Sequence, residues 1–270
     1  MSTRDRGLQP SALRRFFAPV SPLFLLKTLL YRLGYSIKRI RPVPAAHRAS
    51  STREVADIRG LLHSTDPYAG FDASQHPLDT HGWGSDSPAF RELLTELKPR
   101  FVVEVGTWKG GSALQMADII AELGLPTEIL CIDTWLGALE FWTDHDDPER
   151  YKSLALRHGY PTVYYQFLAN VVHRGHQARI IPFPQTSTTG ALWLRWFDLR
   201  AELIYIDGSH EEEDVYADLI AYWEVLAPGG TIFGDDYVWD SVRLAVERFS
   251  RELRLKIEFI ADKWVLRKPR

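Results

Sequence analysis

Three aspartates follow two short apolar segments of this chain. Asp207 ends the segment that begins at Leu203, and Asp235 and Asp236 end the segment that begins at Gly230. Both segments have strand character, and neighbouring parallel strands bring their carboxyl ends to one edge of a sheet. Three converging carboxylates repel one another unless a cation or a basic group neutralises them, and hard oxygen ligands suit Mg²⁺. The pattern therefore predicts a metal site formed by these three side chains.

A glycine-containing turn follows the first predicted strand, in the sequence from Glu104 to Ser112. Gly106 and Gly110 allow the backbone to turn and to approach a ligand closely. The spacing is not the dinucleotide fingerprint G-x-G-x-x-G, because Trp108 stands where that motif has a glycine. Glu104 ends the strand and offers negative charge to a ligand ammonium group. An ordinary tight turn between a strand and a helix is the alternative interpretation.

Asp133 ends the second predicted strand. An acidic side chain at this position can accept hydrogen bonds from both ribose hydroxyls of a nucleoside. Trp135 stands two residues further on, where an aromatic ring could cover an adenine face. The alternative for Asp133 is helix capping, which aspartate often performs. With the glycine turn beside it, we favour the ribose role.

Strand-like and helix-like segments alternate from Arg100 onward. This alternation predicts an α/β fold with a Rossmann-like, doubly wound and mostly parallel sheet. The short connection from Ala261 to Lys263 predicts a C-terminal antiparallel hairpin. Ser87 is expected to cap the helix that precedes the first strand. The predicted strands are residues 101–105, 128–132, 180–183, 203–206, 230–233, 255–260 and 264–266.

Composition divides the chain into parts of different character. Residues 1–48 are basic and apolar and carry a net charge of +9, which leaves −12 for residues 49–270. An acidic body does not suit a nucleic-acid partner but does suit cation binding. The first segment is too interrupted to span a membrane and has no signal-peptide cleavage site. Packing on the body or on a second copy of the chain, and binding to an anionic membrane surface, both stay open for it.

The remaining sequence is expected to form a helical extension (49–98) that covers the ligand site, followed by a catalytic domain (99–270). A long excursion after the second strand, at about residues 135–178, is expected to act as a substrate lid. Cys131 is the only cysteine and lies in an apolar run, which indicates a buried thiol. A reducing, cytoplasmic location fits this cysteine usage, with peripheral membrane contact through residues 1–48 as an open addition.

These motifs together resemble the class I S-adenosylmethionine-dependent methyltransferases over roughly residues 80–270. The stretches 206–210 and 234–237 narrow the resemblance to the macrocin and mycinamicin type of sugar O-methyltransferase, whose members use Mg²⁺. The resemblance implies that Asp207, Asp235 and Asp236 are metal ligands. It also implies the S-adenosylmethionine-binding residues: Glu104 and Gly106 for the methionine part, Asp133 for the ribose, Gln185 to Ser187 near the adenine, and Thr107, Gly110, Ser112, Thr134 and Trp135 around them.

The sequence offers two candidates for the general base. His210 is the first candidate, because it lies just past Asp207 and titrates near neutrality. Tyr237 is the second candidate, and Asp207 completes the expected catalytic set. A helix-start role for His210 and a packing role for Tyr237 are the alternatives. The mycinamicin-type pattern has a histidine two residues after the aspartate pair, whereas this chain has Val238.

The sequence thus predicts an Mg²⁺-dependent O-methyltransferase that acts on a hydroxyl of a sugar, a glycosylated natural product or a small polyol. Two alternatives stay open: a non-methylating, cephalosporin-hydroxylase-like enzyme of the same fold, and a membrane-docked binding protein. Self-association through the apolar N-terminal segment also stays open.

Overall fold

The computed structural model describes residues 57–143 and 148–270, so the expectations for residues 1–48 lie outside the described part of the chain. A seven-stranded sheet forms its centre, in the order β3-β2-β1-β4-β5-β7-β6. The first five strands are parallel, and β7 pairs antiparallel with both β5 and β6. This arrangement confirms the predicted fold class. The strands are β1 (Phe101–Val105), β2 (Glu128–Asp133), β3 (Ile180–Pro184), β4 (Ala201–Ile206), β5 (Leu226–Gly234), β6 (Glu258–Ile260) and β7 (Lys263–Arg267).

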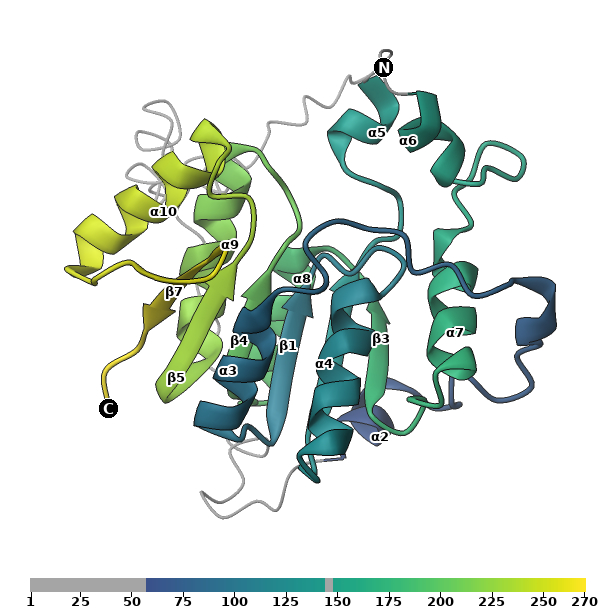
Figure 1. The fold of residues 1–270 in the computed structure, drawn as a ribbon, viewed down its shortest axis with the longest axis horizontal. Helices are drawn as coiled ribbons and strands as arrows, with labels where there is room; N and C mark the ends of the chain where they lie inside the picture. The colour runs from purple at the N-terminus through teal and green to yellow at the C-terminus, as the bar shows by residue number, and fades with distance from the viewer. Residues whose placement is uncertain (1–56, 144–147) are drawn as a thin grey trace, which may run out of the picture. The chain divides into compact units, whose positions relative to one another are not determined.

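Helices cover both faces of the sheet (Figure 1). One face packs on α8 (Ser187–Trp196), α9 (Glu212–Val225) and α10 (Asp240–Leu253). The other packs on α3 (Pro88–Leu97), α4 (Gly111–Glu122) and α7 (Val163–His173). Strand residues alternate between the two layers, as a pleated strand requires. Val103 and Val105 of β1 face the first layer, and Val102 faces the second.

Two strand boundaries differ from the sequence prediction. β5 begins at Leu226, four residues early, because Leu226 already pairs with Ala201 of β4. The Pro228-Gly229-Gly230 stretch lies in the register shift between this pair and the next one, Leu203 with Thr231. The strand predicted over residues 255–260 is confined to β6, because Leu255 first donates its N–H back to the carbonyl of Ser250 at the end of α10. Ser87 caps α3 as predicted, accepting from the N–H of Ala89.

The excursion at residues 135–178 is not a lid throughout its length. Its last helix, α7, buries Val163, Phe167 and Val171 in the core and belongs to the helical layer. Two short helices, α5 (Leu139–Thr143) and α6 (Pro148–Ser153), stand beyond the carboxyl ends of the strands (Figure 1). The lid expectation is therefore confined to the described residues of this earlier part.

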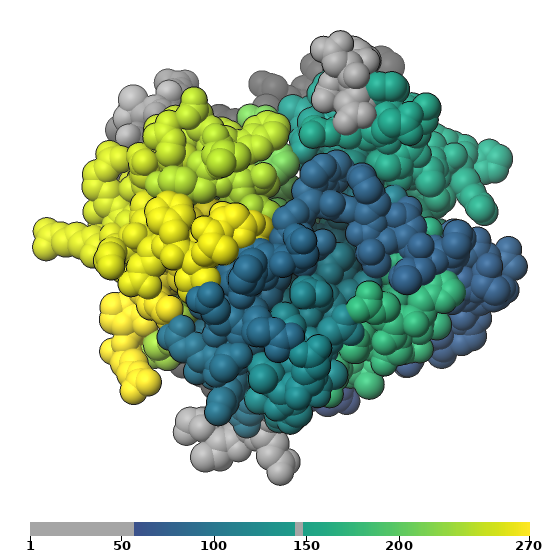
Figure 2. Space-filling view, in the orientation of Figure 1, coloured from purple at the N-terminus to yellow at the C-terminus, as the bar shows by residue number. Residues whose placement is uncertain are grey.

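The extension before α3 begins with α2 (Ile58–Leu62) and a short 3₁₀ helix, η3 (Ala73–Gln75). Figure 2 shows the residues that lead into α3, in blue, crossing the face of the molecule. Asn170 of α7 holds this crossing in place, donating to the carbonyl of Asp79 and accepting from its N–H. Lys109 forms an ion pair with Asp79 at 2.6 Å. We call residues 80–85, which follow this anchor, the cover segment.

Candidate active site

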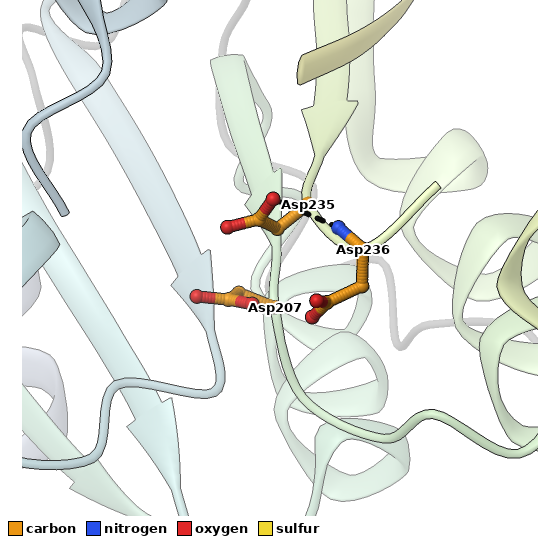
Figure 3. Close-up of side chains that lie close together, drawn as sticks. All are labelled: Asp207, Asp235 and Asp236. Carbon is orange, nitrogen blue, oxygen red and sulfur yellow. Dashed lines mark hydrogen bonds between the residues drawn. The ribbon is translucent and has the colours of Figure 1, made fainter. Parts of the chain in front are cut away.

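The three aspartates meet at the carboxyl ends of β4 and β5, as the sequence predicts. Ile206 pairs with Gly234 in the sheet, so Asp207 and Asp235 follow neighbouring positions. One carboxylate oxygen from each of Asp207, Asp235 and Asp236 lies within 4.8 Å of the others. Figure 3 shows the three carboxylates gathered at one side of the strand ends, with the N–H of Asp236 donating to Asp235.

Burial makes this cluster costly to ionise. The pKa of Asp207 is raised well above its usual value, first by burial and then by the charges of Asp235 and Asp236. The hydroxyl of Tyr205 donates to Asp207 Oδ2 at 3.1 Å. A buried carboxylate surrounded by like charges needs a counter-charge to stay ionised.

Lys263 supplies one such counter-charge. Its side chain is fully buried at the start of β7, and its Nζ atom lies 2.5 Å from Asp235 Oδ2 and 2.8 Å from Asp262 Oδ2. The cover segment closes over this pair, because a Cβ atom on Gly84 would lie 2.1 Å from Asp235 Oδ2 and 2.6 Å from Lys263 Nζ. Sequence reasoning missed Lys263, since its residue type in a hairpin connection indicates only an exposed turn.

The cluster fits a hard divalent cation on its chemistry. Lys263 offsets one of three carboxylate charges, so the trio and this lysine together keep a charge of −2 when ionised. Each carboxylate carries four lone-pair sites, so Asp235 can accept from Lys263 and from the Asp236 N–H and still offer oxygen to a metal. The repulsion that raises the pKa of Asp207 is the repulsion that a bound cation would relieve.

His210 stands at the trio between two acids from different segments. Its Nε2 atom lies 2.9 Å from Asp236 Oδ2. Its Nδ1 atom lies 3.0 Å from Glu140 Oε1 of α5, outside hydrogen-bonding alignment. Contact with Asp236 and then Glu140 raises the pKa of His210 to about 10. In this arrangement the imidazole is therefore protonated on both nitrogens at neutral pH. A cationic imidazole has no free lone pair with which to act as a general base.

Tyr237, the second candidate base, points away from the trio. Its hydroxyl donates to Glu247 at 3.4 Å, and its ring packs against Phe259 with centroids 4.9 Å apart. Its position after two aspartates in sequence did not reveal this direction, because the left-handed backbone of Asp236 (φ 59°) turns the chain there. This placement favours the packing alternative.

Glu104 is fully buried beneath the glycine turn. The hydroxyls of Ser112 and Thr107 and the thiol of Cys131 all donate to its carboxylate. Burial raises the pKa of Glu104 to about 7, although these three donors oppose the shift. Direct contact with a ligand ammonium would therefore require an opening between the carboxylate and the cavity.

Asp133 serves the turn itself. Its Oδ2 atom accepts from the N–H groups of Thr107 and Trp108, each at 2.8 Å, and Oδ1 accepts from the N–H of Trp135 at 2.7 Å. These bonds fix the glycine turn against the end of β2. None of these three N–H groups lies in a helix, so Asp133 does not cap one, and a ribose hydroxyl would use the lone pairs that remain.

Trp135 is placed differently from the expected adenine cover. The side chain is only 2% exposed and packs against Tyr164 and Phe167 of α7, with centroids 4.8 and 4.9 Å apart. The left-handed backbone at Trp135 (φ 53°) directs the ring inward, where its indole N–H donates to the carbonyl of Trp108 at 2.7 Å. Trp135 is therefore a core residue that supports the turn.

A cavity of about 710 Å³ joins the glycine turn to the trio. Glu104, Gly110, Trp135 and Tyr237 are outside its lining. The predicted site residues that line it are Gly106, Thr107, Ser112, Asp133, Thr134, Gln185, Ser187, Asp207, His210, Asp235 and Asp236. Eleven of the fifteen predicted site residues thus converge on one cavity.

Several lining residues were not identified from the sequence. Asp218 of α9 is buried beside Ser187, and burial raises its pKa to about 6. Trp83 of the cover segment, Phe141 of α5 and Trp239 before α10 add aromatic surface. In the sequence, nothing distinguishes Asp218 and Phe141 from ordinary helix residues. Only the tertiary fold brings them to the cavity. None of the described helices is both long and apolar enough to cross a membrane.

Comparison with known proteins places this site in a family context. A family model described as a methyltransferase domain matches residues 103–237, half of the chain. The rhamnosyl O-methyltransferase of Mycobacterium tuberculosis is 41% identical over 56 residues, which are 21% of this chain and 23% of that protein. Its counterpart in Mycobacterium leprae is 41% identical over 49 residues, 18% of this chain and 21% of that one. The matched segments thus span less than a quarter of these relatives.

Solved structures give a further comparison at low sequence identity. The O-methyltransferase NovP superimposes with a TM-score of 0.48 and 16% identity, covering 67% of this chain and 78% of NovP. The O-methyltransferase TomG of Streptomyces achromogenes, solved with S-adenosylmethionine, superimposes with a TM-score of 0.47 and 14% identity. This match covers 78% of this chain and 93% of TomG.

Proposed function

Because this chain belongs to the methyltransferase domain family, we propose that it is an S-adenosylmethionine-dependent O-methyltransferase that needs a hard divalent cation such as Mg²⁺. The proposed acceptor is a hydroxyl of a sugar, a glycosylated natural product or a small polyol. The observation that carries the proposal is one cavity that contains both the glycine turn of β1 and the aspartate trio of β4 and β5. The names of the rhamnosyl O-methyltransferase relatives support a sugar acceptor.

The chain's own residues would contribute mainly by positioning. Methyl transfer is an in-line displacement, so its rate depends on holding the acceptor oxygen in line with the methyl group. The glycine turn allows close approach of the donor, and Asp207, Asp235 and Asp236 would hold the cation. When bound, such a cation lowers the pKa of a hydroxyl and fixes its orientation.

The aromatic wall suits a carbohydrate acceptor. Trp83 and Phe141 meet edge to face with centroids 6.0 Å apart, and both line the cavity near the trio-facing helix α5. Aromatic faces offer rigid apolar surface to the C–H face of a sugar ring. The polar rim formed by Glu140, His210 and Asp214 can hydrogen-bond to hydroxyl groups on the ring edge.

The test measures transfer of a labelled methyl group from S-adenosylmethionine to a panel of rhamnosides and other glycosides. We expect activity that requires Mg²⁺ and falls by at least about a hundredfold in the double variant Asp235→Asn/Asp236→Asn, since metal stabilisation contributes several kcal/mol. Asp198→Asn is the matched control, because Asp198 is an exposed aspartate outside the cavity. Unchanged activity in saturating chelator would refute the metal role. Cofactor binding without label transfer to any hydroxyl would favour the hydroxylase-like alternative.

A further inference from the structure

We propose that hydrogen-bond donors around the aspartate trio make its metal site selective for Mg²⁺ over Ca²⁺, and that the hydroxyl of Tyr205 is one determinant of this selectivity. The inference rests on the metal role proposed above, but not on the cofactor or the acceptor. It gives a function to a core tyrosine to which sequence analysis assigned none. Each of the three carboxylates contacts a donor from a different part of the fold.

Tyr205 holds Asp207 from within the core of the domain. It belongs to β4, and its side chain is fully buried. Its ring packs edge to face on Phe90 of α3, with centroids 5.2 Å apart, and lies 4.8 Å from the ring of Phe233 in β5. These neighbours fix the direction of the hydroxyl, which donates to Asp207 Oδ2 at 3.1 Å. One oxygen of a cavity-lining carboxylate is therefore held from behind.

The other two carboxylates are held in a similar way. Lys263 Nζ lies 2.5 Å from Asp235 Oδ2, and the N–H of Asp236 donates to Asp235 Oδ1 at 2.8 Å. His210 Nε2 lies 2.9 Å from Asp236 Oδ2, and its ring stacks on that of Trp239 with centroids 4.8 Å apart. Each carboxylate of the trio thus has at least one oxygen fixed by the protein, so the trio is a rigid set of possible ligands.

Rigidity distinguishes between the two common hard cations. Ca²⁺ takes about six to eight oxygen ligands in flexible arrangements and often binds a carboxylate through both oxygens. That mode requires a carboxylate to turn both oxygens toward the ion, and the donors around the trio oppose this rotation. Mg²⁺ instead requires near-octahedral geometry and keeps several waters. Three carboxylates that each direct one oxygen to the ion suit Mg²⁺ better than Ca²⁺.

The experiment measures the Kd of Mg²⁺ and of Ca²⁺ by calorimetry on the whole chain without cofactor. We expect the wild-type protein to bind Mg²⁺ more tightly than Ca²⁺. Tyr205→Phe keeps the packed ring but frees Asp207 Oδ2. In this variant the ratio of the Ca²⁺ Kd to the Mg²⁺ Kd should fall about tenfold, the size typical for losing a hydrogen bond to a metal-ligating side chain.

Tyr222→Phe is the matched control, because its hydroxyl is also lost from a buried tyrosine but donates to the carbonyl of Ser187, away from the trio. Its Kd ratio should equal that of the wild type. Asp207→Asn should lose the binding of both ions, which would assign the measured binding to the trio.

Two results would overturn the selectivity proposal while the metal role stands. One is tighter binding of Ca²⁺ than of Mg²⁺ by the wild-type protein. The other is a Kd ratio in Tyr205→Phe that equals the ratio in Tyr222→Phe. If the wild-type protein bound neither ion, or if Asp207→Asn bound them as the wild type does, the metal role itself would be wrong.

Discussion

Burial determines what the acidic side chains in and beside this cavity can do. Asp207, Glu104 and Asp218 all have raised pKa values because each is withdrawn from water. Asp235 is held instead by an ion pair with a lysine. Residue type alone does not distinguish these cases.

Glu104 gives the cofactor-free protein a predictable pH dependence. Its pKa rises from 4.5 to about 7 on folding, so the folded protein holds this proton more tightly than the unfolded chain. Its ionisation therefore costs stability, and the cost develops as pH rises from 4.5 to about 7. In Glu104→Gln, we expect the free energy of unfolding, relative to wild type, to rise by up to about 3 kcal/mol between pH 5 and pH 8.

Urea unfolding at a series of pH values measures this difference. Glu122→Gln is the control, because Glu122 is an exposed acid at the end of α4. Its stability relative to wild type should change little over the same range. If the free energy of unfolding of Glu104→Gln, relative to wild type, did not change with pH, the donors around Glu104 would already compensate its burial.

Lys263 should be among the most sensitive residues of the molecule. Replacing it with methionine keeps most of the buried volume but leaves Asp235 without its counter-charge. Breaking a buried ion pair from one side costs about 3–5 kcal/mol. We expect Lys263→Met to lower the free energy of unfolding by an amount of this order, and added Mg²⁺ to restore part of it.

Lys256→Met provides the comparison, since that lysine is largely exposed and only 3.9 Å from its nearest acid. Thermal unfolding with and without Mg²⁺ distinguishes the two variants. If Lys263→Met were no less stable than Lys256→Met, the ion pair with Asp235 would not be important for the fold.

At the scale of the elements, the ends of β1 and β4 approach each other closely at the site. Gly106 has a φ of 82°, and a Cβ atom there would lie 2.0 Å from the carbonyl oxygen of Asp207. The turn after β1 and the first residue after β4 are thus in direct backbone contact. This contact aligns the donor end of the cavity with the first aspartate of the trio.

Gly106→Ala tests that approach, with Gly124→Ala as its control. Gly124 also has a positive φ, of 64°, but nothing lies within 4 Å of a Cβ atom there. Gly124→Ala should cost about 1 kcal/mol for its backbone conformation alone. Gly106→Ala should cost at least about 3 kcal/mol, because backbone must also shift. Chemical denaturation measures both, and equal costs would contradict the close approach.

At the scale of the whole molecule, the cavity connects segments from most of the chain. Its lining runs from Gly82 to Trp239 and includes the ends of β1, β2, β4 and β5 as well as α5 and α9. A ligand that fills it should therefore stabilise the domain as a unit. At a concentration of 100 times its Kd, S-adenosylhomocysteine should add about 2.7 kcal/mol.

Thermal unfolding would register this as a rise of roughly 5–10 °C for a domain of this size. NAD at the same concentration is the negative control, because the glycine turn lacks the dinucleotide spacing. A shift with NAD that equals the shift with S-adenosylhomocysteine would contradict the cofactor assignment.

The sequence by itself determined the layered α/β fold, the terminal hairpin and the convergence of the aspartates. Strand periodicity and the strand-end positions of Asp207, Asp235 and Asp236 are local signals, and parallel pairing converts them into proximity. The glycine turn and Asp133 were located by the same reasoning.

Only the tertiary structure decided how these groups are charged and directed. Lys263 reaches Asp235 from a hairpin, and Glu140 reaches His210 from a helix beyond the strand ends. Trp135 turns into the core, and Tyr237 turns toward α10. Such contacts depend on backbone direction and on neighbours distant in sequence, which no local pattern encodes. The pKa of His210 is set by contact with Asp236 and Glu140 rather than by its residue type.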